Sequence, residues 1–458
     1  MIRRATHFAL FALGTLLVGG TAAAQDMKGV AKPQPNEAWL RDSRYTNGEG
    51  FETDRYKLSP GIAAAIGYDS NLFLRSGSTN PAEPVTDAFV LSLTPFLTVN
   101  PRTTPTPPTY AFSATLAATY YEYMKAFNTA PGDDPSKFRN VGISAATKLA
   151  FSPGRRWSGD LHAALGRSIQ PSSLGDPSAT YNRTVPTAGA ALQWAPGGGL
   201  FTWKFGYDVA YSYFEAERFQ PLNSFNHQLS TTGSWRFLPR TSLFSQSTYT
   251  MIRYTAATTT QADGDAVSTV VGVNGLVTSG FGFLAAAGWA STFFNDKGGQ
   301  QDFDSFIAQA EARFYLSAPP KNDSPGNYPS SFVLGYVRDW TQSYIGNFYQ
   351  RDRGYASLSY FFNGKVLANA TAGVSRIHFP PTVYTDGTPR DSAFDNLAVD
   401  AGAFFEYRVT PHVGLNASVQ YSQMISDKKL RTNPTVATEV DDQKWTRIQA
   451  TLGARYLF

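Results

Sequence analysis

The sequence predicts an all-β protein, a transmembrane antiparallel up-and-down β-barrel of about 18 strands. Three observations predict it. Apolar and polar residues alternate with a period of two in many segments of roughly 10–15 residues. Short turns alternate with long polar loops along the chain, as in outer-membrane barrels. No run of about 18 apolar residues follows the N-terminal leader, so a membrane-embedded chain would have to cross as strands.

The composition agrees with this fold class. Charged residues make up only 16% of the 458 residues and aromatic residues 14%, while the mean hydropathy is −0.26. Low charge, many aromatics and mild hydrophilicity fit apolar and polar residues interleaved at short period. The chain has no cysteine, which excludes disulfides, cysteine-ligated metal centres and a thiol nucleophile. A net charge of +4 without a long basic run gives no reason to expect a nucleic-acid partner.

The N-terminus has the pattern of a secretory signal. Arg3 and Arg4 precede an apolar stretch at 8–18, and small residues precede an expected cleavage after Ala24. We therefore expect a signal peptide at 1–24, a short polar periplasmic segment at 25–56 and an outer-membrane β-barrel at 57–458. The alternative for 25–56 is a tail without a role. This organisation places the protein in the outer membrane of a Gram-negative bacterium as an integral, multi-pass protein.

The alternation is clearest in five segments, at 87–100, 200–214, 306–316, 396–408 and 413–422. In 200–214, for example, Trp203 and Tyr207 fall on one face while Lys204 and Asp208 fall on the other. A helical period of 3.6 would leave no consistent face in these segments. Segments 57–69 and 241–254 alternate weakly, so 16 strands is the alternative count. Pro95 and Pro186 lie inside expected strands, where each removes a ladder hydrogen bond.

The connections differ in length on the two sides of the expected barrel. Short turns are expected near 153–156, 196–199, 239–241, 279–280, 363–364 and 410–412, with longer Pro-rich connections at 101–108 and 318–328. Polar loops are expected at 70–86, 125–137, 170–180, 215–222, 255–265, 295–301, 342–348, 379–392 and 426–442. In outer-membrane barrels the short turns are periplasmic and the long loops extracellular. An even number of strands then leaves both termini in the periplasm.

The final segment, 447–458, alternates up to the last residue, Phe458. A closed barrel requires this, because its last strand must pair with its first. The terminal aromatic also resembles the C-terminal signal that the barrel-insertion machinery reads in bacterial outer-membrane proteins. We expect Tyr456 and Phe458 to form that insertion signal on the lipid-facing side, with membrane lipid and the insertion machinery as partners.

A barrel of about 18 strands should enclose an aqueous channel. With the polar face taken as inward, the expected pore-lining residues are Lys148, Asp160, Lys204, Asp208, Arg236, Glu311, Arg313, Asp400, Glu406, Arg408, Arg447 and Arg455. Such a wall would bind a hydrated solute weakly at many sites, and its excess of cations suggests a weak preference for anions. The alternative is that these charges pair with each other and only solvate the wall.

We expect no enzymatic activity, cofactor or metal. His162 lies two residues from Asp160 on one strand face, so the spacing allows a hydrogen-bonded pair, although an inward histidine near a carboxylate is usually structural. No serine motif accompanies them, as a histidine-dependent barrel hydrolase would need. The chain also lacks a histidine cluster or an acidic loop with metal-ligand spacing.

The stretch "LSPGIAAAIGYDSNLFLRSGS" (58–78), with Tyr68, Asp69, Ser70 and Asn71, resembles the first strand and loop of bacterial outer-membrane barrels of the "β-barrel porin 2" type. Barrels of this kind, and the roughly 18-stranded exporters they resemble, are associated with secretion of exopolysaccharide or capsule. The resemblance implies a polysaccharide conduit in which lumenal tyrosines contact sugar rings. A separate periplasmic export protein would deliver the polymer, because the chain lacks the helical-repeat domain of several exporters.

Two alternatives remain open from the sequence. The first is a general or solute-specific diffusion porin. The second is a structural barrel or adhesin whose loops bind, with Tyr344, Phe348 and Tyr349 as a compact aromatic cluster.

Overall fold

The computed structural model describes residues 50–76, 85–102, 108–130, 132–168, 182–256, 262–294, 302–316, 330–342, 348–362, 365–383, 389–431 and 440–458. The expected signal peptide and most of the 25–56 segment lie outside these residues and stay predictions. The described part contains no helix with the length and hydropathy needed to cross a bilayer.

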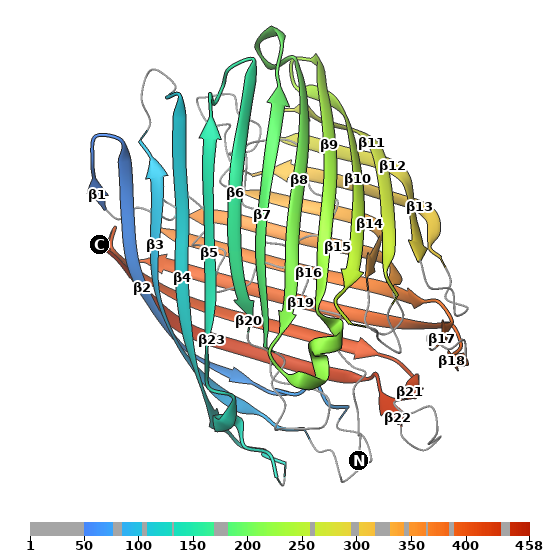
Figure 1. Ribbon diagram of the computed structural model, residues 1–458. Helices are drawn as coiled ribbons and strands as arrows, with labels where there is room; N and C mark the ends of the chain where they lie inside the picture. The colour runs from blue at the N-terminus through green and yellow to red at the C-terminus, as the bar shows by residue number, and fades with distance from the viewer. Residues whose placement is uncertain are drawn as a thin grey trace.

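Eighteen antiparallel strands form one closed barrel (Figure 1). They are β2 (Tyr56–Asp69), β3 (Ala88–Pro101), β4 (Tyr110–Lys125), β5 (Asn140–Phe151), β6 (Trp157–Ser168), β7 (Arg183–Trp194), β8 (Phe201–Phe214), β9 (Ser224–Leu238), β10 (Thr241–Tyr254), β11 (Gly264–Thr278), β12 (Phe281–Phe294), β13 (Asp304–Tyr315), β14 (Ser331–Gln342), β15 (Phe348–Phe362), β16 (Val366–Phe379), β19 (Phe394–Arg408), β20 (Val413–Ile425) and β23 (Trp445–Leu457). The all-β barrel is confirmed with 18 strands, so the weakly alternating segments at β2 and β10 are strands.

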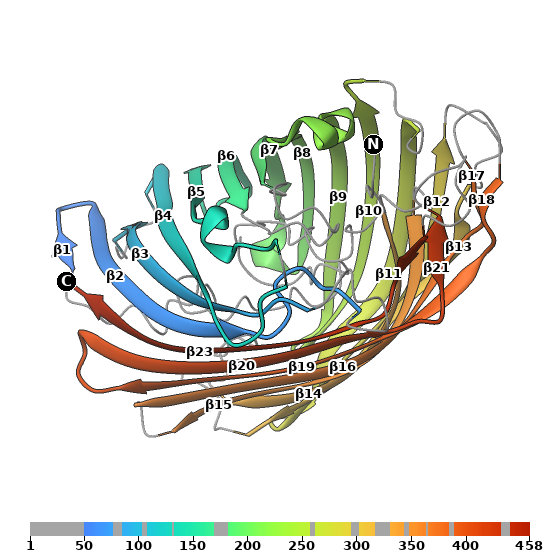
Figure 2. The same cartoon turned by 90° about the horizontal axis from the view of Figure 1, so that it is seen from below.

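The barrel closes where its last strand meets its first. β23 pairs with β2 from Gly61↔Leu457 to Asp69↔Gln449, and Figure 2 shows the two side by side. The terminal residue takes part, because the Phe458 N–H donates to the Pro60 carbonyl (3.1 Å). The Phe458 carbonyl in turn accepts from the Gly50 N–H (3.0 Å). The expectation that alternation runs to the chain end in order to close the sheet is therefore confirmed.

Smaller elements lie between the barrel strands, at the two ends of the barrel. They are β1 (Phe51–Glu52), which pairs with β2, the hairpins β17 (Thr382–Val383) with β18 (Pro389–Asp391) and β21 (Lys429–Arg431) with β22 (Val440–Asp442), and three 3-10 turns, η1 (Pro135–Phe138), η2 (Gly197–Gly199) and η3 (Glu217–Leu222). Most connections on the side of the C-terminus are short turns, with the expected longer ones after β3 and β13, and most connections on the other side are longer loops, the one between β14 and β15 being short. The short-turn side is periplasmic and the long-loop side is extracellular.

The outer face of the barrel is apolar and exposed. Trp157, Trp235, Trp289 and Phe205 are each more than half exposed on this face, and Leu452 is 65% exposed. An apolar surface that encircles the molecule would be unfavourable in water but is suited to lipid. The protein is therefore an outer-membrane barrel, and side chains that alternate with these residues face the interior.

The two strand prolines each interrupt the strand pairing on one side only, as the loss of one N–H predicts. Pro95 lies in β3, which stays in register with β2 there and loses its pairing only toward β4. Pro186 lies in β7, which stays in register with β6 and is interrupted only toward β8. Each proline lacks one N–H, so each disturbs the ladder to one neighbour and leaves the other intact.

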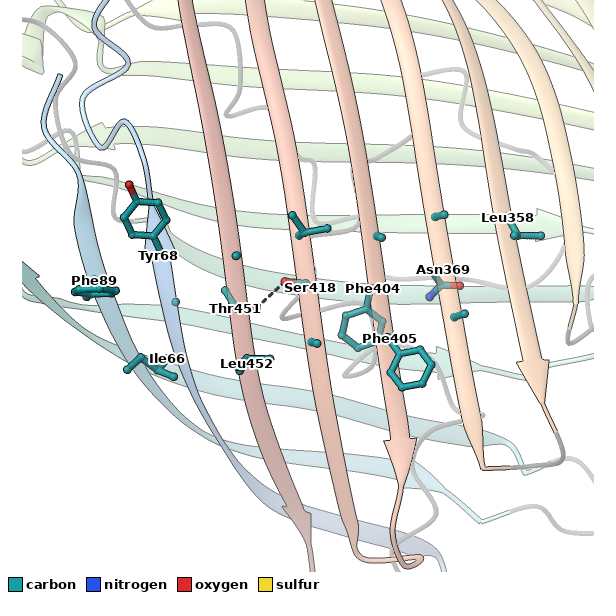
Figure 3. Close-up of a pocket in the computed structure, with 17 residues that line it drawn as sticks. Ile66, Tyr68, Phe89, Leu358, Asn369, Phe404, Phe405, Ser418, Thr451 and Leu452 are labelled. Atoms are coloured by element: carbon teal, nitrogen blue, oxygen red, sulfur yellow. Dashed lines mark hydrogen bonds between the residues drawn. The ribbon is translucent and has the colours of Figure 1, made fainter. Parts of the chain in front are cut away.

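An apolar groove crosses the strands around the closing seam (Figure 3). It follows one row of paired residues, in which Ala370 faces Ala403, Ala403 faces Val419, and Val419 faces Ala450. Ile66 and Leu452, which border this row, are strongly exposed on the outer face. The groove therefore faces lipid and is not part of the interior path.

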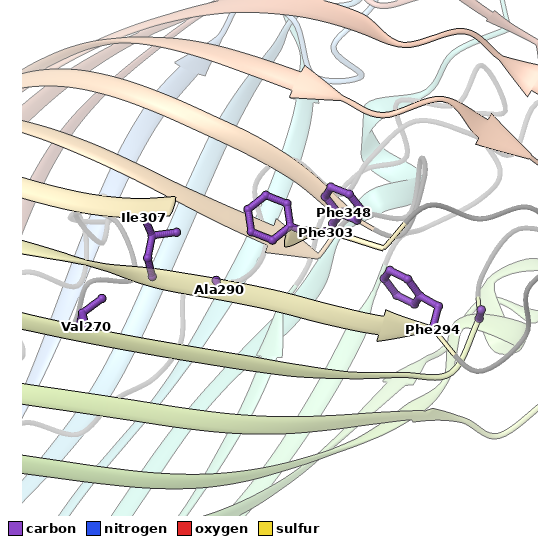
Figure 4. Packing of buried hydrophobic residues seen from close by; sticks show 7 residues of the cluster. Val270, Ala290, Phe294, Phe303, Ile307 and Phe348 are labelled. Carbon is purple, nitrogen blue, oxygen red and sulfur yellow. The ribbon is translucent and has the colours of Figure 1, made fainter. Parts of the chain in front are cut away.

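Apolar clusters line the inner face toward the extracellular end. One joins β11–β15 and comprises Ala262, Val270, Ala290, Phe294, Phe303, Ile307 and Phe348 (Figure 4). Another, on β3 and β4, holds Leu72 and Phe73 of the first loop against Tyr123 and Phe138. The extracellular loops are thus anchored on the rim by buried aromatic side chains.

The "YDSN" stretch links the closing seam to the first extracellular loop. The Arg447 Nε of β23 donates to the Asp69 Oδ1 of β2 (2.9 Å), and the Asn71 side chain donates to a β23 carbonyl (3.0 Å). Within the loop, Arg75 pairs with Asp133 of the next loop (2.6 Å), and both side chains are buried. These contacts fix the extracellular ends of the first and last strands to each other.

Candidate functional site: two inner walls

All twelve expected pore-lining residues lie on the inner face of the barrel. Each occupies the position that alternates with exposed apolar residues of its strand, as Lys204 and Asp208 alternate with Phe205 and Tyr207. The expected insertion residues Tyr456 and Phe458 lie on the outer face with their rings in edge contact at 4.9 Å. Their role as an insertion signal stays a prediction.

On the inner face of β13–β23, here named the paired wall, charged side chains are buried against each other. Arg353 on β15 makes two hydrogen bonds to Asp400 on β19, at 2.7 and 2.9 Å. Gly373 on the intervening strand β16 leaves room for this guanidinium, because a Cβ there would overlap with it. The two charged side chains are only 7% and 11% exposed. This bidentate pair lies across three strands and ties them together.

The same arrangement recurs along the paired wall. Glu311 on β13 accepts hydrogen bonds from Arg313 (2.8 Å) and from the Tyr355 hydroxyl on β15 (2.6 Å). Toward the periplasm, Glu406 on β19 is 1% exposed and accepts from Arg455 on β23. For these residues the alternative from the sequence, in which inward charges pair with each other, describes the structure better than a solute path.

The inner face of β5–β10, here named the open wall, has a different charge arrangement. His162 on β6 contacts Asp160 on its own strand through Nδ1 (3.0 Å) and Asp208 on β8 through Nε2 (2.6 Å). The imidazole passes over β7 at Gly189, which pairs with His162 on one side and Asp208 on the other. A Cβ at this position would overlap with both side chains. Glycine is therefore required here for a close approach, not for its backbone freedom.

The His162 bridge remains accessible to solvent. His162 and Asp208 are 24% and 32% exposed in their side chains, and Lys148 pairs with Asp160 at 3.5 Å. The Asp160–His162 pair that the spacing allows is present, whereas Asp208 as a second partner was not expected. Since carboxylates occupy both ring nitrogens, this histidine is not arranged as the base for a serine nucleophile. The described residues contain no group of three or more acidic or histidine side chains arranged to hold a metal ion.

A neutral polar lane follows β9 beside this bridge. The inner-face residues of this lane are Ser224, Asn226, Gln228, Ser230, Thr232 and Ser234. Those from Asn226 to Ser234 are half-buried, and Thr248 and Thr250 of β10 continue the lane sideways. At about 3.4 Å per residue the lane is roughly 34 Å long along the strand. Because the strands of such barrels tilt by about 35–45°, it extends roughly 25 Å along the barrel axis, close to the height of the apolar band. It offers hydroxyl and amide groups along most of the channel.

Tyrosines contribute less to the open wall than expected. On β8, Tyr207, Tyr211 and Tyr213 lie on the lipid-facing side, opposite Lys204 and Asp208. Tyr121, on the inner face of β4, is half-buried and stacks on Tyr123. Contact between lumenal tyrosines and sugar rings therefore remains a prediction for a few inner-face residues only.

The sequence analysis missed several inner charges, among them Asp339, Arg351 and Arg353. Arg351 pairs with Asp339 at 2.5 Å across β14 and β15. The signal is ambiguous, because "RDR" at 351–353 places charges on both faces of the strand and hides the alternation. Extending the period of two from the inward Tyr355 would have placed Arg351 and Arg353 inside.

No protein-family model matches the chain, and no curated protein matches its sequence. The resemblance of 58–78 to the β-barrel porin 2 type therefore stays a prediction.

Several solved structures are similar to the chain over most of its length. The outer membrane protein OpdK from Pseudomonas aeruginosa is 10% identical, with 88% of this chain and 99% of that chain covered at a TM-score of 0.48. OccAB4 from Acinetobacter baumannii is 9% identical, with 88% and 99% covered at a TM-score of 0.45. A bacterial polysaccharide outer membrane secretin is 8% identical, with 87% and 98% covered at a TM-score of 0.34. These likenesses concern the fold alone.

Proposed function

We propose that this outer-membrane channel exports a polysaccharide, an exopolysaccharide or capsule, with a separate periplasmic protein that delivers the polymer. The observation that carries the proposal is the neutral polar lane on β9. Hydroxyl and amide side chains can exchange hydrogen bonds with sugar hydroxyls as readily as with water. Many such weak contacts in series hold a polymer in the channel without trapping it.

The distribution of charge on the inner face supports this use of the open wall. The carboxylates of Asp160 and Asp208 are engaged by His162 and Lys148, so they do not stand as isolated charges beside the lane. The paired wall offers buried side chains, which are poorly placed to contact a passing solute. The path we propose therefore runs along β5–β10.

Deletion of the gene tests the proposal. We expect the deletion strain to lose surface polysaccharide and to retain polymer in the periplasm, while uptake of small nutrients is unchanged. A plasmid copy that carries Gly189→Ala should restore surface polysaccharide to the deletion strain only in part. A copy that carries Gly402→Ala, the matched control, should restore it fully. Normal surface polysaccharide in the deletion strain would contradict the proposal.

A solute-specific porin is the second candidate, favoured by the compact charge cluster around His162. Such a channel would admit small solutes, so proteoliposomes should swell in small sugars or amino acids. Under this alternative, swelling should be selective among solutes of equal size, and Asp208→Asn should change the selectivity. Equal swelling rates for solutes of equal size would contradict a solute-specific porin.

A further inference from the structure

The periplasmic rim of the barrel is strongly basic. In the described turns and strand ends on this side, the cationic residues are Arg55, Lys57, Arg102, Arg155, Arg156, Arg240 and Lys365. The acidic residues of the same described segments are Glu52 and Asp54, and Glu52 is already paired with Arg102 at 3.3 Å. All of these cations except Lys57 are exposed. The rim therefore presents unbalanced positive charge to the periplasm.

The inner face just above this rim is basic as well. Within about three residues of the periplasmic strand ends, the inward cations are Lys148, Lys204, Arg236, Arg313, Arg408 and Arg455, and the inward acids are Asp160, Glu311 and Glu406. Lys204 on β8 and Arg236 on β9 are exposed and lie at the periplasmic end of the neutral polar lane. We name the rim and these inward cations together the periplasmic basic ring.

The extracellular end does not share this excess. Its described loops and turns contain the acidic residues Asp87, Asp133, Asp134, Glu215, Glu217, Asp263, Asp302, Asp391 and Asp427 together with the cations Arg75, Lys137, Arg139, Lys428 and Lys444. Within about three residues of the extracellular strand ends, the inward cations are Lys125, Arg183, Arg351 and Arg447, and the inward acids are Asp69 and Asp339. Acidic residues therefore balance or exceed cations at this end. Several of these are paired within the loops, as Arg75 is with Asp133 (2.6 Å) and Lys428 with Asp391 (3.7 Å). In the part of the chain that the structure describes, charge is therefore distributed asymmetrically along the channel axis, with the positive end toward the periplasm.

We infer that the transported polymer is anionic, a saccharide that carries carboxylate or other acidic groups, and that the periplasmic basic ring captures it from the periplasm. This inference rests on the proposed export function. A mouth lined by charge of one sign raises the local concentration of oppositely charged solute. The neutral lane that follows would let the captured polymer move on, because it holds no further cation between Arg236 and the extracellular rim of β9.

Phospholipid head groups are the other anions that a basic rim could meet. They can reach rim residues on the outside of the barrel, but Lys204 and Arg236 face the interior. The inward part of the ring therefore separates the two explanations. A solute explanation requires Lys204 and Arg236, whereas a lipid explanation does not.

Planar-bilayer recordings on the full protein purified from outer membranes test the inference. In a potassium chloride gradient, the reversal potential should show preference for chloride. A short oligogalacturonate should block the current at a roughly tenfold lower concentration than a maltooligosaccharide of equal length, because its carboxylates are attracted by the ring. The variant Lys204→Gln/Arg236→Gln should lose most of both effects.

Lys137→Gln is the matched control, since it removes an exposed lysine at the extracellular end and should leave both effects unchanged. Preference for potassium in the unmodified channel, equal block by the two oligosaccharides, or an equal effect of Lys137→Gln would each overturn the inference. Loss of surface polysaccharide in the deletion strain is scored separately. An anion-selective pore in a strain with normal surface polymer would refute the export proposal while leaving the anion site in place.

Discussion

The two inner walls of this barrel differ in how their inward charged side chains are paired and how far they are exposed. On the paired wall, Arg353 and Asp400 are buried and joined by two hydrogen bonds. On the open wall, His162 and Asp208 are also joined, but they stay partly exposed beside a lane of neutral side chains. The difference teaches that inward position alone does not make a residue part of a solute path. Exposure and pairing must be known as well.

The largest effect is expected from breaking the paired wall. Arg353→Ala leaves the buried Asp400 carboxylate without its partner, which should cost about 3–5 kcal/mol of unfolding free energy. The measurement is denaturant unfolding in detergent, monitored by the difference in gel mobility between the folded and the unfolded barrel.

The control for this variant is Arg353→Leu/Asp400→Leu, which removes both charges and should recover much of the lost stability. Folded protein that does form should show unmodified conductance. A stability loss for Arg353→Ala below about 1 kcal/mol, the range of an exposed pair, would show that this wall is not buried as described.

The next largest effect is expected at Gly189. A methyl group there overlaps with His162 and Asp208, so Gly189→Ala should break the bridge and change single-channel conductance. Gly402→Ala is the matched control, because it adds a methyl group on the inner face of β19 where the nearest atom lies at an ordinary 3.5 Å. Equal conductance changes in the two variants would remove the distinction between the walls.

A smaller effect is expected from Asp208→Asn, which keeps the shape of the side chain and removes its charge. Because Asp208 is a third exposed, unfolding free energy should change by less than about 1 kcal/mol. The open wall becomes more positive, so the reversal potential should shift further toward chloride. A shift toward potassium would contradict the position of Asp208 beside the solute path.

The barrel architecture could be predicted from the sequence almost in full, because a period of two survives wherever one face meets lipid. Turns, loops and the closing strand followed from that alternation. The division into two walls could not be predicted, because it depends on which strands lie beside each other. Asp208 reaches His162 only because Gly189 lies between them, 19 residues from one and 27 from the other along the chain.

The smallest effect concerns pH at the extracellular rim. The Arg167 guanidinium, bonded to Glu215 at 2.7 Å, holds the pKa of that carboxyl below its usual range. A lowered pKa in the folded state means that this contact stabilises the fold above the unfolded pKa of about 4.3 and that the contribution is lost as pH falls through the lowered value. Unfolding midpoints between pH 7 and pH 3 should therefore fall slightly less in Glu215→Gln than in the unmodified protein. An identical pH dependence would contradict this account.

Single-cysteine accessibility tests most directly whether the open wall lines the solute path. The chain has no cysteine, so Thr232→Cys on β9 and Ser375→Cys on β16 each introduce one thiol on the inner face. Thr232 is half-buried, whereas Ser375 is 2% exposed. A membrane-impermeant, charged thiol reagent should react rapidly with the first variant and lower its channel current, and should leave the second unchanged. Equal reaction at both positions, or faster reaction at Ser375→Cys, would contradict a solute path along β5–β10.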